Sequence, residues 1–471
     1  MIRERGVFLL PIKNRNPGSP KTKTFIMKFF LLLFISIAAA APGLLAARPN
    51  IIFIYADDMG YGDCVVYNAG ISIPTPNIDQ LAKEGLRFTD AHAPHATCTG
   101  SRYGFLTGTS PARTGVKNTL ASSRAVIDEG ESTIAQLLKD QGYHTRMVGK
   151  WHLGFNLPAG TSKKTINDKS TLRGGPMDHG FEYFHGDYAG LSEFPIRGRN
   201  QVGQAIDIRT QNRTYCEDVV KMIKEHAKSD GRKPLFLYYA LHEPHNPHLP
   251  EKNLVGKSGV GPYGDYLVQM DHWVGEVLKT LKNTGLDKKT MVIFASDNGA
   301  SKKNMSTCPN HLANGVLSGY KAMPLEGGHR TPLIVKWPGR VPENTTTSAL
   351  VNHTDFFATF ADLLKVDYAK RYPKSARDSH SFLPVLSNPS ARHSRPPMVV
   401  LGSYRIGSWK LIADGYRGNG KNAKATALYD LSKDLSEKTN LLKSHPKKAQ
   451  SLLAGYQDFL HSRDLKTDPR K

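Results

Sequence analysis

Cysteine is scarce in this sequence of 471 residues, which contains only four, at positions 64, 98, 216 and 308. So few cysteines in so long a chain exclude a fold held together by a disulfide framework. Cys98 belongs to a motif that is described below. The other three cysteines could form one disulfide bridge and leave one free thiol, and the sequence does not say which two would pair. The core therefore depends on ordinary packing, and 39% hydrophobic with 22% charged residues is typical of a globular protein.

The chain also lacks an apolar run long enough for a comfortable membrane span. The best candidate, residues 29–37, follows Met27-Lys28 and precedes an alanine run and Leu45-Ala46-Ala47. A basic start, a short apolar core and small residues at its end predict a secretory signal peptide. We expect residues 1–47 to be this peptide with an upstream extension from a start codon called too early, and the protein to be exported, periplasmic or secreted. A retained membrane anchor is the alternative.

Acidic residues are few relative to basic ones, 41 against 63, which gives a net charge of +22. Residues 1–47 contain seven Lys or Arg and one acidic residue, so the remainder carries about +16. Such a charge attracts polyanions, whether nucleic acid, anionic lipid or a sulfated polysaccharide. The sequence has no helix-turn-helix pattern, zinc-finger spacing or RNP-like aromatic motif, which argues against nucleic acid. A basic surface without a specific partner is the alternative.

Three continuous apolar runs are present, each typical of a strand buried on both faces. They are residues 50–56, 235–240 and 291–296, and helical patterns lie at 133–141 and 266–281. This alternation predicts an α/β fold with a large, mostly parallel sheet flanked by helices. Ligands of such folds bind beyond the carboxyl ends of the strands. The polar residues that follow the three runs should therefore meet at one edge.

After about residue 395 the pattern changes to short strands separated by Gly, Asn and Asp turns, which predicts a small antiparallel unit. The domain boundaries that we predict are a main domain over 48–371, a Pro- and Ser-rich linker over 372–397, a C-terminal antiparallel subdomain over 398–463 and a polar tail over 464–471.

Two polar pairs follow the first and third runs and offer only oxygen ligands: Asp57 with Asp58, and Asp297 with Asn298. Oxygen ligands suit Ca²⁺ or Mg²⁺ and argue against a structural zinc site of Cys and His. Either pair alone could simply cap a helix. Two pairs at two strand ends of one sheet favour a metal site.

Cationic and titratable groups occur in three further places. Lys150 and His152 lie between glycines that allow close backbone approach, although a plain turn is the alternative. Lys321 is a candidate anion contact, with a solvent-exposed lysine as the alternative. A histidine triplet with a spacing of three (His242, His245 and His248) raises the hypothesis of a zinc site. Interleaved prolines forbid a regular helix, and no further ligand set completes the site. We therefore interpret His245 and His242 as acid/base or anion-binding groups.

Together these motifs resemble the sulfatases, the formylglycine-dependent branch of the alkaline-phosphatase superfamily. The resemblance covers nearly all of the chain after residue 47, and the order and completeness of the motifs make it specific. They are Asp57-Asp58, Cys98 to Arg102 with Leu106-Thr107-Gly108, Gly149 to Gly154, Ser296 to Gly299, Glu326-Gly327-Gly328, and Trp409-Lys410-Leu411 with Leu428-Tyr429-Asp430-Leu431.

The resemblance implies an alkaline-phosphatase-like fold and a defined chemistry. In that family a maturation enzyme oxidises the cysteine of Cys-x-Pro/Ala-x-Arg to formylglycine during export. One hydroxyl of the hydrated aldehyde attacks sulfur, and the other then expels sulfate. The implied site is a cation, Ca²⁺ with Mg²⁺ as the alternative, held by Asp57, Asp58, Cys98, Asp297 and Asn298; Arg102 and Lys150 stabilising the ionised hydrate; Lys321 and His242 contacting substrate; His152 as base; and His245 as acid.

We therefore expect a sulfuric ester hydrolase, with a sulfated carbohydrate slightly favoured over an aryl sulfate because of the positive charge. The alternatives are a phosphodiesterase or phosphonate hydrolase of the same superfamily, and a non-catalytic binder of sulfated glycans. Gly100 departs from the family pattern, which has Pro or Ala there, and this departure concerns recognition by the maturation enzyme. The family's polar sulfate contact after His179-Gly180-Phe181 aligns with Gly190, and Ser192 could substitute.

Overall fold

The centre of the fold is built from the three apolar runs. The computed structural model describes residues 48–116, 124–158, 169–229, 231–416 and 422–466, so the predicted signal peptide lies outside the described residues. Strand β1 (Asn50–Ala56) pairs in parallel with β8 (Leu235–Ala240) and β9 (Thr290–Ser296), and every residue of the three strands is buried. The prediction of buried parallel strands is confirmed.

Among the described residues ten strands form one mixed sheet in the order β11-β2-β10-β9-β1-β8-β4-β5-β6-β7. The five at its centre, β9 to β5, run parallel, and their carboxyl ends therefore share one edge. The flanking β10 and the hairpin β6–β7 run antiparallel to their neighbours. The other bounds are β2 (Leu86–Phe88), β4 (His144–Lys150), β5 (Tyr183–Asp187), β6 (Ile196–Arg197), β7 (Asn200–Gln201), β10 (Leu333–Lys336) and β11 (Thr345–Thr347), with β3 (Ala91–His92) and β12 (Val351–Asn352) paired separately.

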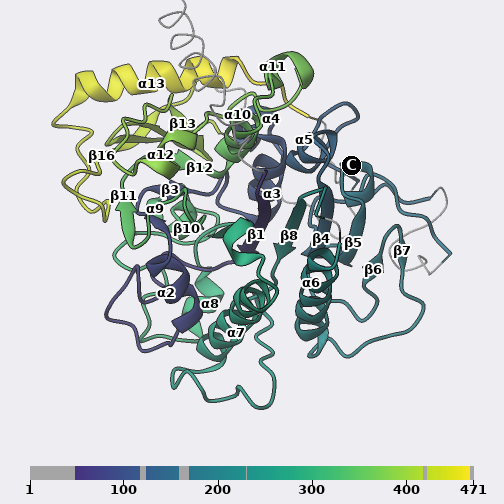
Figure 1. Ribbon diagram of the computed structural model, residues 1–471. Helices are drawn as coiled ribbons and strands as arrows, with labels where there is room; N and C mark the ends of the chain where they lie inside the picture. The colour runs from purple at the N-terminus through teal and green to yellow at the C-terminus, as the bar shows by residue number, and fades with distance from the viewer. Residues whose placement is uncertain (1–47, 117–123, 159–168, 230, 417–421, 467–471) are drawn as a thin grey trace, which may run out of the picture. The chain divides into compact units, whose positions relative to one another are not determined.

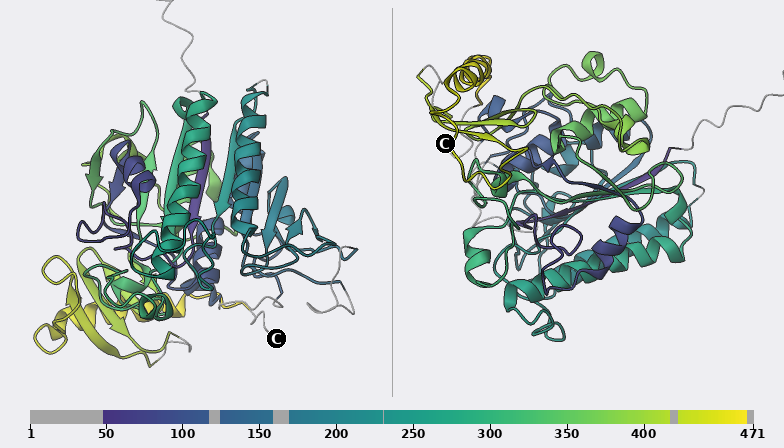
Figure 2. Two further views of the ribbon diagram at one scale, coloured as in Figure 1. Left: turned by 90° about the horizontal axis from the view of Figure 1, so that it is seen from below. Right: turned by 90° about the vertical axis from the view of Figure 1, so that its left-hand side faces the viewer.

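Helices cover both faces of the sheet, as the right-hand view of Figure 2 shows. Because side chains alternate along a strand, Ile52 and Ile54 of β1 enter one core cluster. Ile51, Phe53 and Tyr55 enter the other cluster, on the opposite face of the sheet. Each fully buried side chain of this size contributes about 1.5–3 kcal/mol. The first cluster lies under α2 (Pro76–Lys83), α6 (Gln211–Ala227) and α7 (Pro262–Asn283), and the second under α3 (Cys98–Thr107), α5 (Ile134–Asp140) and α10 (Phe356–Leu363).

A second, four-stranded antiparallel sheet follows in the C-terminal region (Figure 1), which confirms that part of the fold prediction. Its strands are β13 (Met398–Val400), β14 (Ser403–Ile406), β15 (Trp409–Ala413) and β16 (Ala425–Asp430), and α13 (Pro446–His461) packs on them. The shorter helices are α4 (Pro111–Thr114), α8 (Lys302–Ser306), α9 (Glu326–His329), α11 (Tyr368–Arg371) and α12 (Leu383–Ser387). The boundaries at 371 and 397 stay predictions.

All four cysteines are among the described residues, and all four are free thiols. The bridge that three cysteines would allow is thus not formed in the structure. In the described parts of the chain, none of the helices has the length and apolar character that crossing a membrane would require.

Candidate active site

Polar side chains gather at the carboxyl edge of the five parallel strands. Asp57 and Asp58 follow β1, Asp297 and Asn298 follow β9, His242 follows β8, and Lys150 and Asp187 end β4 and β5. The predicted convergence of the strand ends is confirmed, because β1 pairs directly with both β8 and β9.

Cys98 is the first residue of α3 and is buried beside the acidic pair. Its Sγ lies 3.2 Å from Asp57 Oδ1 and 3.7 Å from Asp58 Oδ1. The ammonium of Lys321 donates to the same sulfur at 3.2 Å. Burial, together with the charges of Asp297 and Asp57, raises the pKa of Cys98 well above its ordinary value. The residue is therefore a thiol at neutral pH, and a thiol is a weak nucleophile.

Arg102 lies one helical turn after Cys98, on the same face of α3. Its Nε and Nη2 donate to Asp297 Oδ2 at 3.0 and 2.8 Å, and Nη1 donates to the carbonyl oxygen of Lys150 at 3.1 Å. The guanidinium is fully buried, so these bonds fix it in one orientation. Arg102 thus ties α3 to the carboxyl ends of β9 and β4.

Lys150 is held at the end of β4 and forms an ion pair with Asp57. Burial opposes ionisation of Asp57, but Lys150, followed by His245 and Arg102, holds the pKa of Asp57 well below its usual range. The preceding Gly149 has φ +102°, and a Cβ there would lie 1.9 Å from the carbonyl oxygen of Ala240. Only glycine lets β4 approach β8 this closely and still deliver the lysine.

Lys321 comes from the loop before α9 and is largely buried, not a surface lysine. Its Nζ donates to Asp58 Oδ1 at 2.5 Å, and its backbone N–H donates to Ala300 O at 3.0 Å. Although burial alone would lower it, Asp58 and Cys98 raise the pKa of Lys321 well above its ordinary value. A permanent cation therefore lies against residue 98.

The acidic residues fit a divalent cation. Asp58 Oδ2 and Asn298 Oδ1 are buried and have no hydrogen-bond partner among the described residues. Asp58 also adopts φ +65°, a strained backbone conformation of the kind that clusters at functional sites. Burial, and then the charge of Asp57, raises the pKa of Asp297 to about 7. A hard cation would satisfy both orphaned oxygens and the crowded carboxylates.

The geometry places ligand atoms of Asp57, Asp58, Cys98 and His245 within 4.8 Å of one another. The other two predicted ligands contact Asp58: Asp297 Oδ1 accepts from the backbone N–H of Asp58 at 3.2 Å, and Asn298 Nδ2 donates to Asp58 Oδ1 at 2.8 Å. The structure thus brings the predicted ligands together and adds His245 to them by distance.

The three histidines that suggested zinc face three different partners. His242 Nε2 lies 3.3 Å from Asp187 Oδ2, His245 Nε2 lies 3.8 Å from Asp58 Oδ2, and His248 Nε2 lies 3.3 Å from Asn304 Oδ1. They do not converge on a common point, which agrees with the rejection of a zinc triplet. The side chain of His245 is 29% exposed, so this imidazole reaches the solvent side of the site.

His152 lies in the turn after β4, where its φ is +55° and its backbone N–H donates to Tyr188 O at 2.6 Å. Its imidazole is mostly buried.

Ser192 is the candidate replacement for the polar contact at Gly190. Its hydroxyl oxygen accepts from the backbone N–H of Phe194 at 3.2 Å, and its backbone N–H donates to Gln211 Oε1 at 3.0 Å.

Asp187 is a buried acid at the same edge that the sequence reading missed. Gln211 Nε2 donates to its Oδ1 at 2.9 Å, and Tyr215 O–H donates to its Oδ2 at 2.5 Å. Burial raises the pKa of Asp187 to about 8. An acid at the end of an apolar strand, as at Asp57, is the sequence signal that could have found Asp187. His185-Gly186 interrupts the apolar pattern of β5, so this strand was not predicted.

Gly100 has a structural reason. A Cβ at this position would lie 2.6 Å from the Cγ of His95, whose ring fills the space. His95 Nδ1 bonds Thr97 Oγ1 at 2.8 Å, and its Nε2 bonds the hydroxyl of Tyr416 at 3.2 Å. The family's Pro or Ala would collide with this ring, so Gly100 and His95 form a matched pair.

This edge, with a helix-borne cysteine between acids and lysines, belongs to a known class of hydrolase. Residues 49–366 match the sulfatase family profile, and the chain belongs to the sulfatase family. The predicted family, enzyme class and alkaline-phosphatase-like fold are confirmed.

Relatives match over most of the chain. It is 32% identical to the N-acetylgalactosamine-6-O-sulfatase of Bacteroides thetaiotaomicron, with 86% of this chain and 92% of the relative covered. It is 33% identical to human arylsulfatase A, with 86% of each chain covered. A solved structure from a study of glycosaminoglycan metabolism by B. thetaiotaomicron superposes with a TM-score of 0.78 at 28% identity, covering 88% of this chain and all of that one.

Proposed function

We propose that this sulfatase hydrolyses sulfate esters of a carbohydrate, using a formylglycine at position 98 and a bound divalent cation. The observation that carries the proposal is the position of Cys98. Its sulfur lies between the acidic pair and the ammonium of Lys321, beside two buried oxygens that lack partners. Buried polar groups in an ordinary protein core are hydrogen-bonded, so unpartnered oxygens beside residue 98 support a binding site there.

Residue 98 is proposed to act after oxidation and not as a thiol. The high pKa of Cys98 leaves little thiolate for nucleophilic attack. A formylglycine supplies a hydrated aldehyde, whose hydroxyl groups are the nucleophile and the route to release of sulfate. A maturation enzyme that acts on the chain during export is therefore a required partner, and export to the periplasm or the medium is part of this proposal.

Asp57, Asp58, Asp297, Asn298 and residue 98 are proposed to hold the cation. Carboxylate and amide oxygens favour Ca²⁺, and Mg²⁺ is the alternative. A bound cation polarises the sulfate group and increases the acidity of the hydroxyl group on residue 98.

The cationic side chains stabilise negative charge around residue 98. Arg102 is locked by Asp297, and Lys150 by Asp57, so both present fixed positive charge without reorganisation. Lys321, 3.2 Å from the Cys98 sulfur, is placed to contact sulfate oxygens. His242, whose Nε2 lies 3.3 Å from Asp187 Oδ2 and whose ring nitrogens have no hydrogen-bond partner among the described residues, is proposed as a further substrate contact.

Proton transfer is assigned to two histidines. His152 is proposed to accept the proton that starts sulfate release from residue 98. His245 is the more exposed of the two, and its Nε2 points to the acidic pair from the solvent side. That position suits donation of a proton to the oxygen of the departing alcohol.

A sulfated carbohydrate is the favoured substrate class. The relative with 92% of its length covered is named for an N-acetylgalactosamine 6-sulfate ester. The net charge of about +16 outside residues 1–47 attracts a polyanionic chain.

The test pairs a mass spectrum with an activity assay. The chain is co-expressed with a formylglycine-generating enzyme, and the mass of the peptide containing residue 98 is measured. Hydrolysis of sulfate, phosphate and phosphonate esters is then compared with and without EDTA and added Ca²⁺. We expect formylglycine, sulfate release that Ca²⁺ restores, and no release by Cys98→Ala. Sulfate release that survives Cys98→Ala, or a preference for phosphate or phosphonate esters, would contradict the proposal, and binding without hydrolysis would favour a glycan binder.

A further inference from the structure

Two sequence motifs that have no chemical role so far meet inside the protein. Glu326 of Glu326-Gly327-Gly328 and Lys410 of Trp409-Lys410-Leu411 are both fully buried. Lys410 Nζ lies 2.8 Å from Glu326 Oε1 and 2.8 Å from Glu437 Oε1. The backbone N–H of Glu326 donates to Glu437 Oε2 at 2.6 Å. Lys410 therefore joins the C-terminal sheet to the start of α9.

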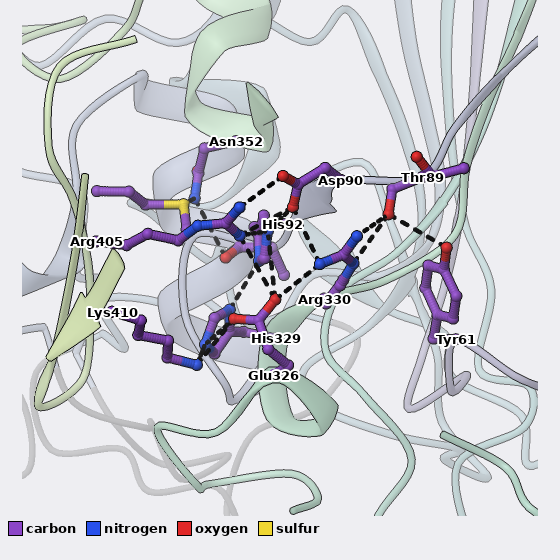
Figure 3. Close-up of polar contacts among 12 residues, drawn as sticks. Tyr61, Thr89, Asp90, His92, Glu326, His329, Arg330, Asn352, Arg405 and Lys410 are labelled. Carbon is purple, nitrogen blue, oxygen red and sulfur yellow. Dashed lines mark hydrogen bonds and ion pairs between the residues drawn. The ribbon is translucent and has the colours of Figure 1, made fainter. Parts of the chain in front are cut away.

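We call the connected buried charges the junction cluster: Asp90, His92, Glu326, His329, Arg330, Arg405, Lys410 and Glu437. Figure 3 shows the carboxylate of Glu326 among the other members that it labels. Glu326 Oε2 accepts from Arg330 at 3.1 Å and from Arg405 at 3.5 Å. Burial alone would raise the pKa of Glu326, but Lys410 and the neighbouring cations hold it well below its usual range. The ligand atoms of His92, Glu326 and His329 lie close enough together to hold a metal ion. The carboxylate of Glu326 is, however, already paired with three cationic side chains, those of Arg330, Arg405 and Lys410.

Three segments of the active site rest on α9. Gly299 N–H donates to Gly328 O at 3.0 Å, Gly327 N–H donates to Ser318 O at 2.8 Å, and Ala93 N–H donates to His329 O at 2.8 Å. The first segment carries Asn298, the second leads to Lys321, and the third leads to Cys98. A single short helix thus supports a metal ligand, the sulfate contact and the nucleophile.

The contacts along α9 leave no space for displacement. A Cβ on Gly299 would lie 1.9 Å from Gly327 O, and one on Gly327 would lie 2.5 Å from Gly319 O. Backbone thus lies directly against backbone at both contacts. Any shift of α9 must therefore move the loops of Asn298 and Lys321 with it.

We propose that Lys410 is a positioning residue for the sulfatase site: by bridging Glu326 and Glu437 it fixes α9, and through α9 the loops that carry Asn298, Lys321 and Cys98. The inference rests on the proposed function, because it assigns Lys410 an effect on the cation and on sulfate. Lys410 acts through these loops and not by touching the substrate.

Lys410→Met tests the proposal in the full chain. We measure the dissociation constant of Ca²⁺ by calorimetry, the inhibition constant of inorganic sulfate, and the melting temperature. Loss of a group hydrogen-bonded directly to a metal ligand weakens metal affinity by about 10–100-fold, and because Lys410 acts one step further away, we expect a weakening of about 10-fold. The same weakening of sulfate inhibition is expected. Arg395→Met is the matched control: Arg395 is buried against Asp355 at 2.9 Å, and none of its contacts with the described residues is to α9. It should lower the melting temperature and leave both constants unchanged.

A double variant separates position from charge. Lys410→Met with Glu437→Gln restores the balance of buried charge, so stability should return towards wild type while Ca²⁺ and sulfate binding stay weak. It also serves if Lys410→Met alone does not fold. Recovery of both binding constants with stability would show a purely structural lysine and overturn the proposal, as would unchanged constants in Lys410→Met. Wild-type protein that binds no Ca²⁺ would overturn the proposed function as well, so the two failures are distinguishable.

Discussion

Two buried charge clusters in this enzyme look alike as metal sites and differ in how their oxygens are satisfied. At the catalytic edge, Asp58 Oδ2 and Asn298 Oδ1 have no hydrogen-bond partner among the described residues. At the junction cluster, both oxygens of Glu326 are bonded to protein cations, and Glu437 Oε1, which has no hydrogen-bond partner among the described residues, forms an ion pair with Lys410 at 2.8 Å. Ligand types and spacing alone therefore do not identify a cation site. The proposed cation site is the cluster that contains oxygens left without a protein partner.

The backbone does not separate the two clusters. Asp58 and His152, at the catalytic edge, have φ values of +65° and +55°, and Glu437, beside Lys410, has φ +51°. Residues in this conformation are held there by the surrounding structure at some cost in stability. The two clusters therefore differ in how their oxygens are paired and not in backbone strain.

The largest expected effect concerns cation binding. Wild type should bind one Ca²⁺ per chain, at the catalytic edge, and Asp58→Asn should lower kcat/KM on a sulfate ester by about 10²–10³-fold because a ligand and its charge are lost. Calorimetry gives the stoichiometry, and the melting curve shows that the variant is folded. Two bound ions, or one that survives Asp58→Asn with full affinity, would place a cation at the junction cluster and break the comparison.

Next in size is a contrast in stability. Glu326→Ala leaves Lys410, Arg330 and Arg405 buried with a partner missing, which should cost about 3–5 kcal/mol of unfolding free energy. Asp58→Asn, measured without metal, should cost less, about 1.5–3 kcal/mol, because the amide oxygen can still accept from Lys321 and the second oxygen of Asp58 is already unpaired. Urea unfolding in EDTA compares them. Equal losses would mean that the two clusters do not differ as described.

A smaller effect is expected for Gly100 of α3 and His95, whose ring packs against it. Gly100→Ala should destabilise the protein by about 1–3 kcal/mol, because the new methyl group overlaps the ring of His95. Adding His95→Ala should recover part of the loss, and a double-mutant cycle measures the coupling. Strictly additive losses would show that His95 does not explain the glycine.

The two regions also differ in the sign of their pH dependence. Asp187 is protonated in the folded chain up to about pH 8, whereas in the unfolded chain it ionises near its ordinary pKa of 3.8. The folded chain then binds more protons, so stability falls as pH rises between these values and levels off above them. In the junction cluster the pKa of Asp90 is lowered despite burial, because of Arg330 and Arg405, so its contribution is lost as pH falls below 3.8.

Melting temperatures measured from pH 3 to pH 9 test both signs. Asp187→Asn should flatten the decline between about pH 4 and pH 8, and Asp90→Asn should weaken the loss below about pH 4. Arg395→Met serves as the control, because it alters a buried ion pair outside both clusters. A profile of Asp187→Asn that runs parallel to wild type would contradict the assignment of the proton to Asp187.

Much of the site could be predicted from sequence because its ligands end buried strands. A continuous apolar run such as residues 50–56 identifies a strand covered on both faces, and parallel strands bring Asp57, Asp297 and His242 to one edge. The spacing of four between Cys98 and Arg102 places both on one helical face. Each of these patterns lies within a short stretch of sequence, and the general rule that parallel strands share one carboxyl edge brings them together.

The tertiary structure alone decided the contacts between distant segments. Burial in the folded chain raises the pKa of Asp187, against the lowering effect of the hydrogen bonds from Tyr215 and Gln211, and Gly100 is explained only by the ring of His95. Glu326 and Lys410 are 84 residues apart, and neither motif carries a signal of the other. The sequence by itself determined that Asp57, Asp58, Asp297 and Asn298 lie at the sheet edge, since the ends of continuous apolar strands are set by local periodicity. Which buried charges are paired and which are left open depends on packing between loops, and no local pattern records it.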